Sequence, residues 1–191
     1  MLRASRADYY NPDEAARDIR KVNPALSQRE ANSLAWGKGR DLLRRAIDER
    51  KDFVFESTLG AHTIPAMLAE AADAGAAVHV WFVGLDSVER HLVRVRARVK
   101  AGGHDIPESD IRRRYETSRE NLAWLMPKLA SLRVYDNSIE ADPASGKSPQ
   151  PRLLLHLDGG RIVAPADLRA TPDWARALVA KAMLIAGAAK R

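Results

Sequence analysis

The sequence predicts an α/β protein in which helices flank a parallel sheet. Three observations support this class. Short runs of strand-forming residues alternate with longer stretches of helical periodicity, as is typical of parallel sheets. One of these runs, VHVWFV at 78–83, is rich in β-branched and aromatic residues. The chain has 191 residues, of which 46% are hydrophobic, so it can bury a full core.

Capping signals and periodicity place the elements of the first half of the chain. Asn11 followed by a proline and, three residues after the cap, by Glu14 predicts the start of a helix. Ser27 with Glu30 three residues later predicts a longer helix that runs to about Arg50. The other elements of this half are a short buried strand at 53–55, a helix at 63–74 and a strand at 78–83.

The second half predicts two basic helices followed by a strand, a hairpin and a closing helix. Apolar residues at 88, 92, 95 and 99 form one stripe of a helix, and a glycine pair precedes the next helix, which begins near Pro107. The remaining elements are a strand at 132–135, a loop at 139–151, hairpin strands at 152–157 and 161–163, and a helix at 172–189. We expect a single domain over residues 1–191, with the hairpin and last helix forming 152–191.

Composition excludes several classes of protein. The chain has no cysteine, so disulfides and thiolate metal sites are absent, and we assign no metal-ligating residue. The first ten residues contain no apolar stretch, so we expect no signal peptide. The longest apolar run, near 177–189, contains Lys181 and is too short to span a bilayer. We therefore expect a cytoplasmic protein without membrane partners.

The excess positive charge is concentrated in one window. Residues 90–119 contain nine basic and four acidic residues, a net charge of +5 out of +6 for the whole chain. Such a local field favours an anionic partner, which leaves nucleotide phosphate, nucleic acid and a solvated helix face open. The last alternative requires ion pairs, and the spacing predicts two of them, Glu108 with Arg112 and Asp110 with Arg114.

Two further segments contain residues suited to chemistry. Glu56-Ser57-Thr58 directly follows the strand at 53–55, and ligands of open parallel sheets bind beyond the carboxyl ends of the strands. These side chains can hold a substrate hydroxyl, a water or a metal, or Ser57 and Thr58 can merely cap the next helix. Asp13 lies in the first turn of the first helix, where favourable interaction with the helix dipole alone would explain a carboxylate.

Two glycine-lysine segments resemble parts of a phosphate loop, and we reject both. Gly146-Lys147-Ser148 leads into Pro149 and not into a helix, whereas a phosphate loop joins a strand to a helix N-terminus. We interpret it as part of a surface loop. The segment GKG at 37–39 lies inside a helical pattern. The 191 residues contain no G-x-x-x-x-G-K-[ST] motif.

Four segments, in this order, resemble the zeta-toxin-like ATPases and kinases of bacteria. They are YYNPDEAAR (9–17), FVFESTLG (53–60), the long segment 78–122 that includes RARVKAGGHDIPESDIRRRYE, and RVYDNS (133–138). The resemblance implies a P-loop NTPase-like fold, ATP and Mg²⁺ as cofactors, and phosphoryl transfer to a small hydroxyl substrate. In the toxin members, that substrate is a UDP-N-acetyl amino sugar. It also implies an antitoxin protein as a partner.

The resemblance also implies roles for individual residues. Asp13 matches the family's catalytic base, and Glu56 matches a carboxylate on the substrate side, with Ser57 and Thr58 beside it. The region 94–114 matches a lid whose arginines contact ATP phosphates. Within the lid we favour Arg98, Arg113 and Arg114 as catalytic, Arg94 as nucleotide-binding, and Asn137 as a contact near the adenine.

The chain departs from the family pattern before Asp13. Family members begin with a strand, a G-x-x-x-x-G-K-[ST] loop and a helix, and these match nothing in this sequence. We therefore expect a vacant central position in the sheet and impaired turnover of ATP. Either the start is misplaced or truncated, or the chain is a non-catalytic remnant or binding module that holds an anionic partner. Nucleic-acid binding ranks last, because the sequence contains no recognition motif.

Overall fold

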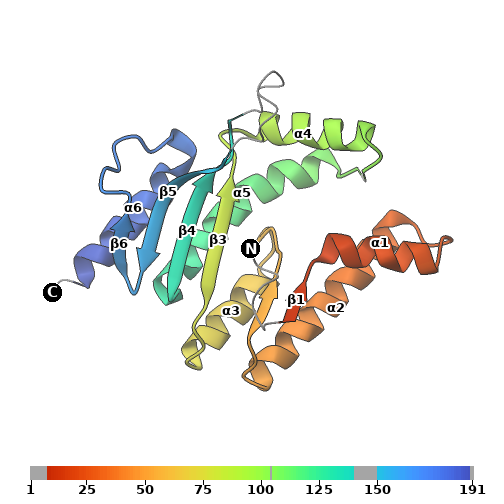
Figure 1. The fold of residues 1–191 in the computed structure, drawn as a ribbon, viewed down its shortest axis with the longest axis horizontal. Coiled ribbons are helices and arrows are strands. Elements are labelled where there is room, and N and C mark those ends of the chain that lie inside the picture. The colour runs from red at the N-terminus through yellow and green to blue at the C-terminus, as the bar shows by residue number, and fades with distance from the viewer. Residues whose placement is uncertain (1–7, 104, 140–149, 190–191) are drawn as a thin grey trace. The chain divides into compact units, whose positions relative to one another are not determined.

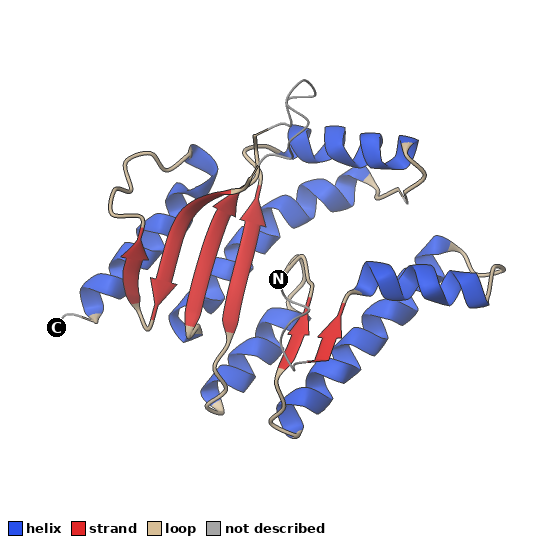
Figure 2. Cartoon of the chain, viewed as in Figure 1, coloured by secondary structure: helices blue, strands red, loops and turns tan. Residues whose placement is uncertain are grey.

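The computed structural model describes residues 8–103, 105–139 and 150–189. The chain divides into two compact units, Met1–Thr58 and Leu59–Arg191. Figure 1 shows the path of the chain, and Figure 2 shows its helices and strands. Within the described residues, no helix combines the length and apolar character needed to cross a membrane.

The first unit contains two short strands and two helices: β1 (Asp8–Tyr10), α1 (Pro12–Val22), α2 (Gln28–Asp48) and β2 (Phe53–Phe55). β1 and β2 pair in parallel, with Tyr9 opposite Val54. α1 and α2 lie side by side (Figure 1) and pack through small residues, so that their backbones approach closely. The buried contact consists of Ala16, Ala31 and Ala35, with Ala15 and Ile19 packed against it.

The caps and the glycines of this unit agree with the sequence. The Asn11 side chain accepts hydrogen bonds from two backbone amides of α1, and Ser27 with Glu30 forms a complete capping box for α2. Gly39 lies inside α2, as the GKG pattern predicts. A Cβ atom at Gly39 would come within 2.6 Å of the Tyr10 ring, and Tyr10 donates a buried hydrogen bond to the Ala35 carbonyl oxygen.

The second unit has a mixed four-stranded sheet in the order β3-β4-β5-β6. β3 and β4 are parallel, whereas the hairpin of β5 and β6 continues the sheet antiparallel to β4. The elements of this unit are α3 (Thr63–Asp73), β3 (His79–Gly84), α4 (Val88–Lys100), α5 (Glu108–Leu125), a 3₁₀ turn (Met126–Lys128), β4 (Ser131–Asp136), β5 (Arg152–Asp158), β6 (Arg161–Ala164) and α6 (Asp173–Ala188).

The core of the second unit lies between this sheet and the helices α5 and α6, which cover one face of it (Figure 1). Its most deeply buried side chains are Leu122, Leu125, Met126, Leu132, Leu155, Leu157 and Leu178. Phe82 of β3 contacts Trp174 of α6, so its neighbours Trp81 and Val83 belong to the opposite face, where they are about half exposed.

The α/β class, the helix starts and the hairpin are confirmed, but two local predictions are wrong. Strand β1 was not predicted, because it has only three residues and only Tyr10 is buried. The strand at 53–55 was predicted to be buried, but it is half-buried, because β1 is the only strand described beside it. The described strands form two sheets; the vacant central position and the single domain stay predictions. Most of the predicted loop, including Gly146-Lys147-Ser148, lies outside the described residues.

Candidate functional site

In the first unit, a hydrogen-bonded cluster lies where β1 and β2 end. Glu56 directly follows β2, and its backbone amide donates to the Tyr10 carbonyl oxygen over 3.1 Å, which extends the parallel pairing. Its carboxylate accepts from the Tyr9 hydroxyl at 2.5 Å and from Asn11 Nδ2 at 2.9 Å. The candidate substrate-side carboxylate is therefore oriented by two donors.

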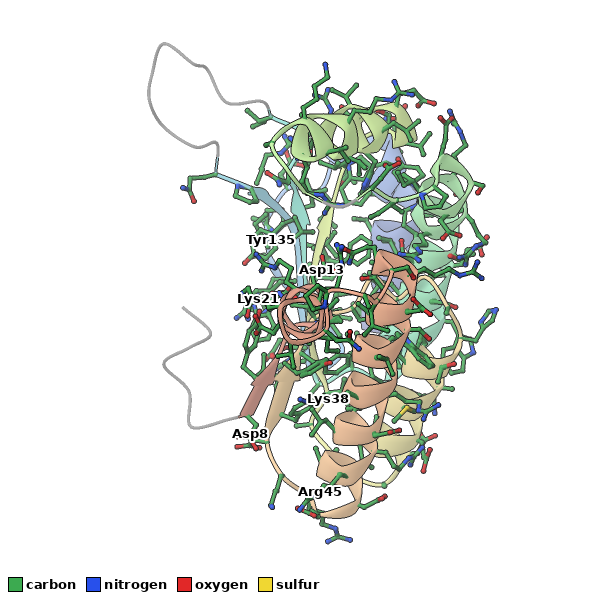
Figure 3. All side chains as sticks on the ribbon, turned by 90° about the vertical axis from the view of Figure 1, so that its right-hand side faces the viewer. Asp8, Asp13, Lys21, Lys38, Arg45 and Tyr135 are labelled. Carbon is green, nitrogen blue, oxygen red and sulfur yellow. The ribbon has the colours of Figure 1, made fainter. Side chains whose placement is uncertain are left out.

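Asn11 connects this cluster to the start of α1. While its amide nitrogen donates to Glu56, its Oδ1 accepts from the backbone amides of Asp13 at 2.8 Å and Glu14 at 3.1 Å. The structure thus brings the first turn of α1, where Asp13 lies, next to the end of β2. Asp13 is exposed, and the cap does not use its carboxylate. Figure 3 looks along α1 and marks Asp13 on it.

The cluster changes the acidity of one of its members. The hydrogen bond to Glu56 raises the pKa of the Tyr9 hydroxyl above its ordinary value, and the contact with Asn11 opposes this effect. Tyr9 therefore stays protonated at neutral pH and remains a donor to Glu56. Ser57 and Thr58 follow as exposed residues at the end of the first unit.

A shallow groove of about 560 Å³ runs beside this cluster within the first unit. Both α1 and α2 contribute to it, and Figure 3 marks Lys38, its one lysine. It is lined by Tyr9, Tyr10, Asn11, Glu14, Ala15, Asp18, Ile19, Val22, Asn23 and Lys38. The groove combines apolar and hydrogen-bonding groups, as sites for small hydroxyl compounds do. Sequence reasoning assigned Asn11 only to the helix cap and gave Tyr9 no role, although Asn11 directly precedes the Pro-Asp-Glu helix start and Tyr9 lies two residues before Asn11.

In the second unit, α4 and α5 form the basic helix pair that the sequence predicts. Gly102 and Gly103 lie in the segment between them, just after the end of α4. Gly102 has φ +87°, and a Cβ atom at Gly103 would lie 2.6 Å from Arg98 Cγ and 2.9 Å from the Arg98 carbonyl oxygen. This corner is tightly packed, with backbone amides of 101–103 bonded to the last turn of α4. Gly102 and Gly103 therefore form a close-fitting cap at the end of α4.

Surface carboxylates pair with the arginines at the start of α5. Arg112 contacts Glu108 at 2.7 Å and Glu89 at 3.1 Å, and the hydrogen bond that Arg112 donates to Glu108 raises the pKa of Arg112. Asp110 contacts both Arg113, at 3.1 Å, and Arg114, at 3.5 Å. Both predicted i,i+4 pairs are thus confirmed, but one carboxylate serves two guanidinium groups. The two helices α4 and α5 therefore retain positive charge that an anion can neutralise.

Arg94 and Asn137 come together beyond the carboxyl ends of β3 and β4. The Arg94 guanidinium donates to the Asn137 carbonyl oxygen at 2.7 Å, and the Asn137 amide donates to the Gly84 carbonyl oxygen at 2.9 Å. Arg94 contacts the backbone of Asn137 and not its side chain, so this contact assigns no role to the Asn137 side chain. Arg98 is exposed in the last turn of α4.

A row of side chains on α5 binds the segment that begins the second unit. Arg113 donates to the Gly60 carbonyl oxygen at 3.1 Å. The Thr117 hydroxyl lies 3.1 Å from the same oxygen and 3.0 Å from the Arg113 carbonyl oxygen of its own helix. Asn121 Nδ2 donates to the carbonyl oxygens of Leu59 at 2.6 Å and Ala61 at 3.3 Å. Sequence reasoning placed Arg113 against phosphate and missed Thr117 and Asn121, whose only signal is their spacing of four residues.

These residues suit the cofactors of the family unequally. The half-exposed guanidinium groups of Arg113 and Arg114 fit the phosphates of ATP. In contrast, no group of three or more histidine, aspartate or glutamate side chains capable of holding a metal occurs among the described residues. Among the described residues, Arg113 and Arg114 therefore offer contacts for the phosphates of ATP.

The α/β architecture, with a basic helix pair near the ends of parallel strands, is consistent with a P-loop-like fold. The family model described as zeta toxin matches residues 12–142, and the chain belongs to that family. An uncharacterised protein of Haemophilus influenzae is 37% identical over 103 residues, which cover 54% of this chain and 71% of that protein. No solved structure matches the chain.

Proposed function

We propose that this chain is a cytoplasmic ATP-dependent phosphotransferase of the zeta toxin family, acting on a small hydroxyl substrate such as a UDP-N-acetyl amino sugar. One observation carries the proposal. Asn11 caps the helix of Asp13 and at the same time orients Glu56, so a single side chain organises two carboxylate-bearing segments. Two such groups, whose neighbours Tyr9 and Asn11 line the groove, suit the binding and deprotonation of a hydroxyl.

Each residue has a defined role in this proposal. Glu56 accepts a hydrogen bond from the substrate, and Asp13 receives the proton of the hydroxyl that attacks the γ-phosphorus. The bond between that phosphorus and ADP breaks, and ADP leaves with the electron pair. Arg98, Arg113 and Arg114 neutralise charge on the transferred group, and Arg94 and Asn137 contact the nucleotide. Mg²⁺ bound together with ATP would lower the negative charge of the phosphates.

We further propose that the 191-residue chain alone turns over ATP weakly. It contains no G-x-x-x-x-G-K-[ST] loop, whose backbone amides and lysine would cradle the β- and γ-phosphates. Calorimetric titration with Mg-ATP tests this. We expect an affinity weaker than micromolar, which means a binding free energy less favourable than about −8 kcal/mol. Micromolar binding would show that the arginines suffice. Sequencing the DNA in frame upstream of Met1 shows whether a loop is encoded there.

A second candidate function is a non-catalytic module that holds an anionic partner, an antitoxin surface among them, through α4 and α5. The sharing of Asp110 by two arginines supports it, since an acidic group of a partner would complete these pairs. Phosphate transfer distinguishes the two functions. The module binds the anion without transferring phosphate, whether or not a phosphate loop is supplied.

A further inference from the structure

In the second unit, hydrogen bonds tie the end of β3 to the end of β4. The Asn137 amide, just beyond β4, donates to the Gly84 carbonyl oxygen at 2.9 Å. The Asp86 amide, just beyond β3, donates to Ser138 Oγ at 2.8 Å. Because the two strands are parallel, both ends lie at one edge of the sheet, and Figure 1 shows α4 beginning there. We call the segments 84–86 and 136–138 the β3–β4 junction.

The Ser138 hydroxyl links the two segments of this junction. Its oxygen accepts from the Asp86 amide, so its single proton is directed to the other side, where it bonds the Asp136 carboxylate. The same carboxylate accepts from the Ser138 backbone amide at 3.0 Å. The Asp86 amide, the Ser138 hydroxyl and the Asp136 carboxylate therefore form one continuous chain of hydrogen bonds.

Asp136 anchors this chain from a buried position. Only 7% of its surface is exposed, and burying a carboxylate is costly unless donors or a positive charge accompany it. Ser138 supplies two donors, and the Arg152 guanidinium lies 3.6 Å from the carboxylate. An ionised carboxylate accepts hydrogen bonds and donates none, so the charge of Asp136 sets the direction of the Ser138 hydroxyl.

The junction is also where both basic helices are attached to the sheet. Ser87, the N-cap of α4, follows it directly. The Tyr115 hydroxyl of α5 donates to the Leu85 carbonyl oxygen at 3.2 Å. Arg94 of α4 donates to the Asn137 carbonyl oxygen at 2.7 Å. The backbone at the junction therefore determines where α4 begins.

We propose that Asp136 and Ser138 are positioning residues. They set the point at which α4 leaves the sheet, and thereby the place at which Arg94 and Arg98 meet the phosphates of a nucleotide, without touching the nucleotide. This inference rests on the proposed function for its purpose. Its physical core, that the chain of hydrogen bonds holds the junction, stands independently of ligand binding.

Nuclear magnetic resonance of the isotope-labelled full chain tests that core by measuring hydrogen exchange at the Asp86 amide. Ser138→Ala removes the acceptor of this amide, so its exchange should quicken roughly tenfold or more. Ser138→Thr keeps the hydroxyl and should leave the exchange close to that of the wild type. A role limited to packing predicts the opposite order, since threonine adds a methyl group and alanine adds none. Equal exchange in the alanine and threonine variants would overturn the proposal.

Ser118→Ala is the matched control in the same unit. It removes a hydroxyl on α5 that lies 3.5 Å from the Tyr115 carbonyl oxygen of its own helix. Exchange at the Asp86 amide should not change in this variant, and exchange at the Val134 amide within β4 should not change in any of the serine variants. Equal quickening in the control would mean general loosening of the unit and would overturn the proposal.

Asp136 provides a second test through a double-mutant cycle. Asp136→Asn keeps the shape of the side chain and removes the charge that directs the hydroxyl, so the Asp86 amide should again exchange faster. Combined with Ser138→Ala, it should cause no further increase, because both substitutions break the same chain. Effects that multiply would show that the two residues act independently and would contradict the proposal. If Asp136→Asn does not fold, the two Ser138 variants decide.

Ligand titration separates this inference from the proposed function. With Mg-ATP as the probe, Ser138→Ala should weaken binding roughly tenfold and Ser138→Thr should bind as the wild type does. Affinity for UDP-N-acetylglucosamine should be almost unchanged in both variants. Equal losses for the two ligands would contradict a role confined to the nucleotide. If the wild-type chain binds neither probe, the proposed function fails, and exchange at the Asp86 amide still decides whether the hydrogen bonds hold the junction.

Discussion

Asn11 is the residue on which the first unit's site depends, because it acts through both ends of its amide. Its oxygen caps α1, and its nitrogen orients Glu56. Aspartate would cap the helix equally well, but it would place a second carboxylate against Glu56. An asparagine is therefore required for the site, although the cap alone would accept either residue.

The cap and the proposed base can be separated by mutation. We predict that Asp13→Asn leaves the melting temperature within a few degrees of the wild type, because the exposed carboxylate takes no part in the cap. Phosphate transfer by a form that carries a phosphate loop should be abolished, since the amide cannot accept the proton. If the variant kept full activity, or lost it only by unfolding, then Asp13 would have no more than a helix-dipole role.

Tyrosine ionisation gives a prediction for alkaline pH. The hydrogen bond to Glu56 raises the pKa of Tyr9, and burial raises the pKa values of Tyr10 and Tyr115. The neutral phenols are therefore favoured in the folded chain. Their contribution is complete below the unfolded pKa of about 10 and is lost as pH rises through the raised folded values.

Urea unfolding at a series of pH values measures this contribution. The free energy of unfolding should fall above pH ~10, and Tyr10→Phe should reduce that dependence. A free energy that stays constant across this range would mean that the folded chain does not favour the neutral phenols.

At the scale of elements, two glycines of α2 make a matched pair. Gly37 has open space where a Cβ atom would lie, whereas the same atom at Gly39 would come within 2.6 Å of the Tyr10 ring. We predict that Gly37→Ala stabilises the chain by about 0.5–1 kcal/mol, because alanine favours the helix. Gly39→Ala should destabilise it by about 1–3 kcal/mol through overpacking.

Thermal unfolding of the two variants side by side checks this pair of predictions. If both substitutions stabilised the chain, the Tyr10 ring would move aside without loss of stability. The ring would then not set how closely β1 can approach α2.

The sequence predicts elements well where a local signal is strong. The caps at Asn11 and Ser27, and the pairing of Arg112 with Glu108, follow from spacing alone, and the structure confirms them. β1 was missed because three residues are too few for a periodic signal. The contacts of Arg113 and Asn121 with the carbonyl oxygens of residues 59–61 could not be predicted. These acceptors are backbone atoms 53–62 residues away in the sequence, and their direction depends on the left-handed turn at Leu59. The roles of Asp13, Glu56 and the lid arginines stay predictions.

At the scale of the whole molecule, we expect the basic charge of α4 and α5 to favour an anionic partner. We predict that Arg113→Ala with Arg114→Ala weakens binding of ATP or inorganic triphosphate roughly tenfold or more, and that wild-type binding weakens as salt rises. Arg176→Ala on α6, which removes one exposed arginine paired with Asp173, is the control. Calorimetry at two salt concentrations measures both effects. Equal affinities in the double variant and the control would exclude these arginines as the phosphate site.

The central claim is that Asp13 and Glu56 act on a hydroxyl substrate whose phosphoryl donor the lid arginines contact. Transfer of labelled γ-phosphate from ATP to UDP-N-acetylglucosamine tests it most directly. The assay compares the 191-residue chain with a form that carries a strand, a G-x-x-x-x-G-K-[ST] loop and a helix ahead of Met1. We predict little transfer by the chain alone, clear transfer by the longer form, and none after Asp13→Asn or Glu56→Gln in that form. Transfer that survives both substitutions, or a folded longer form that transfers no phosphate to any hydroxyl acceptor, would contradict the account.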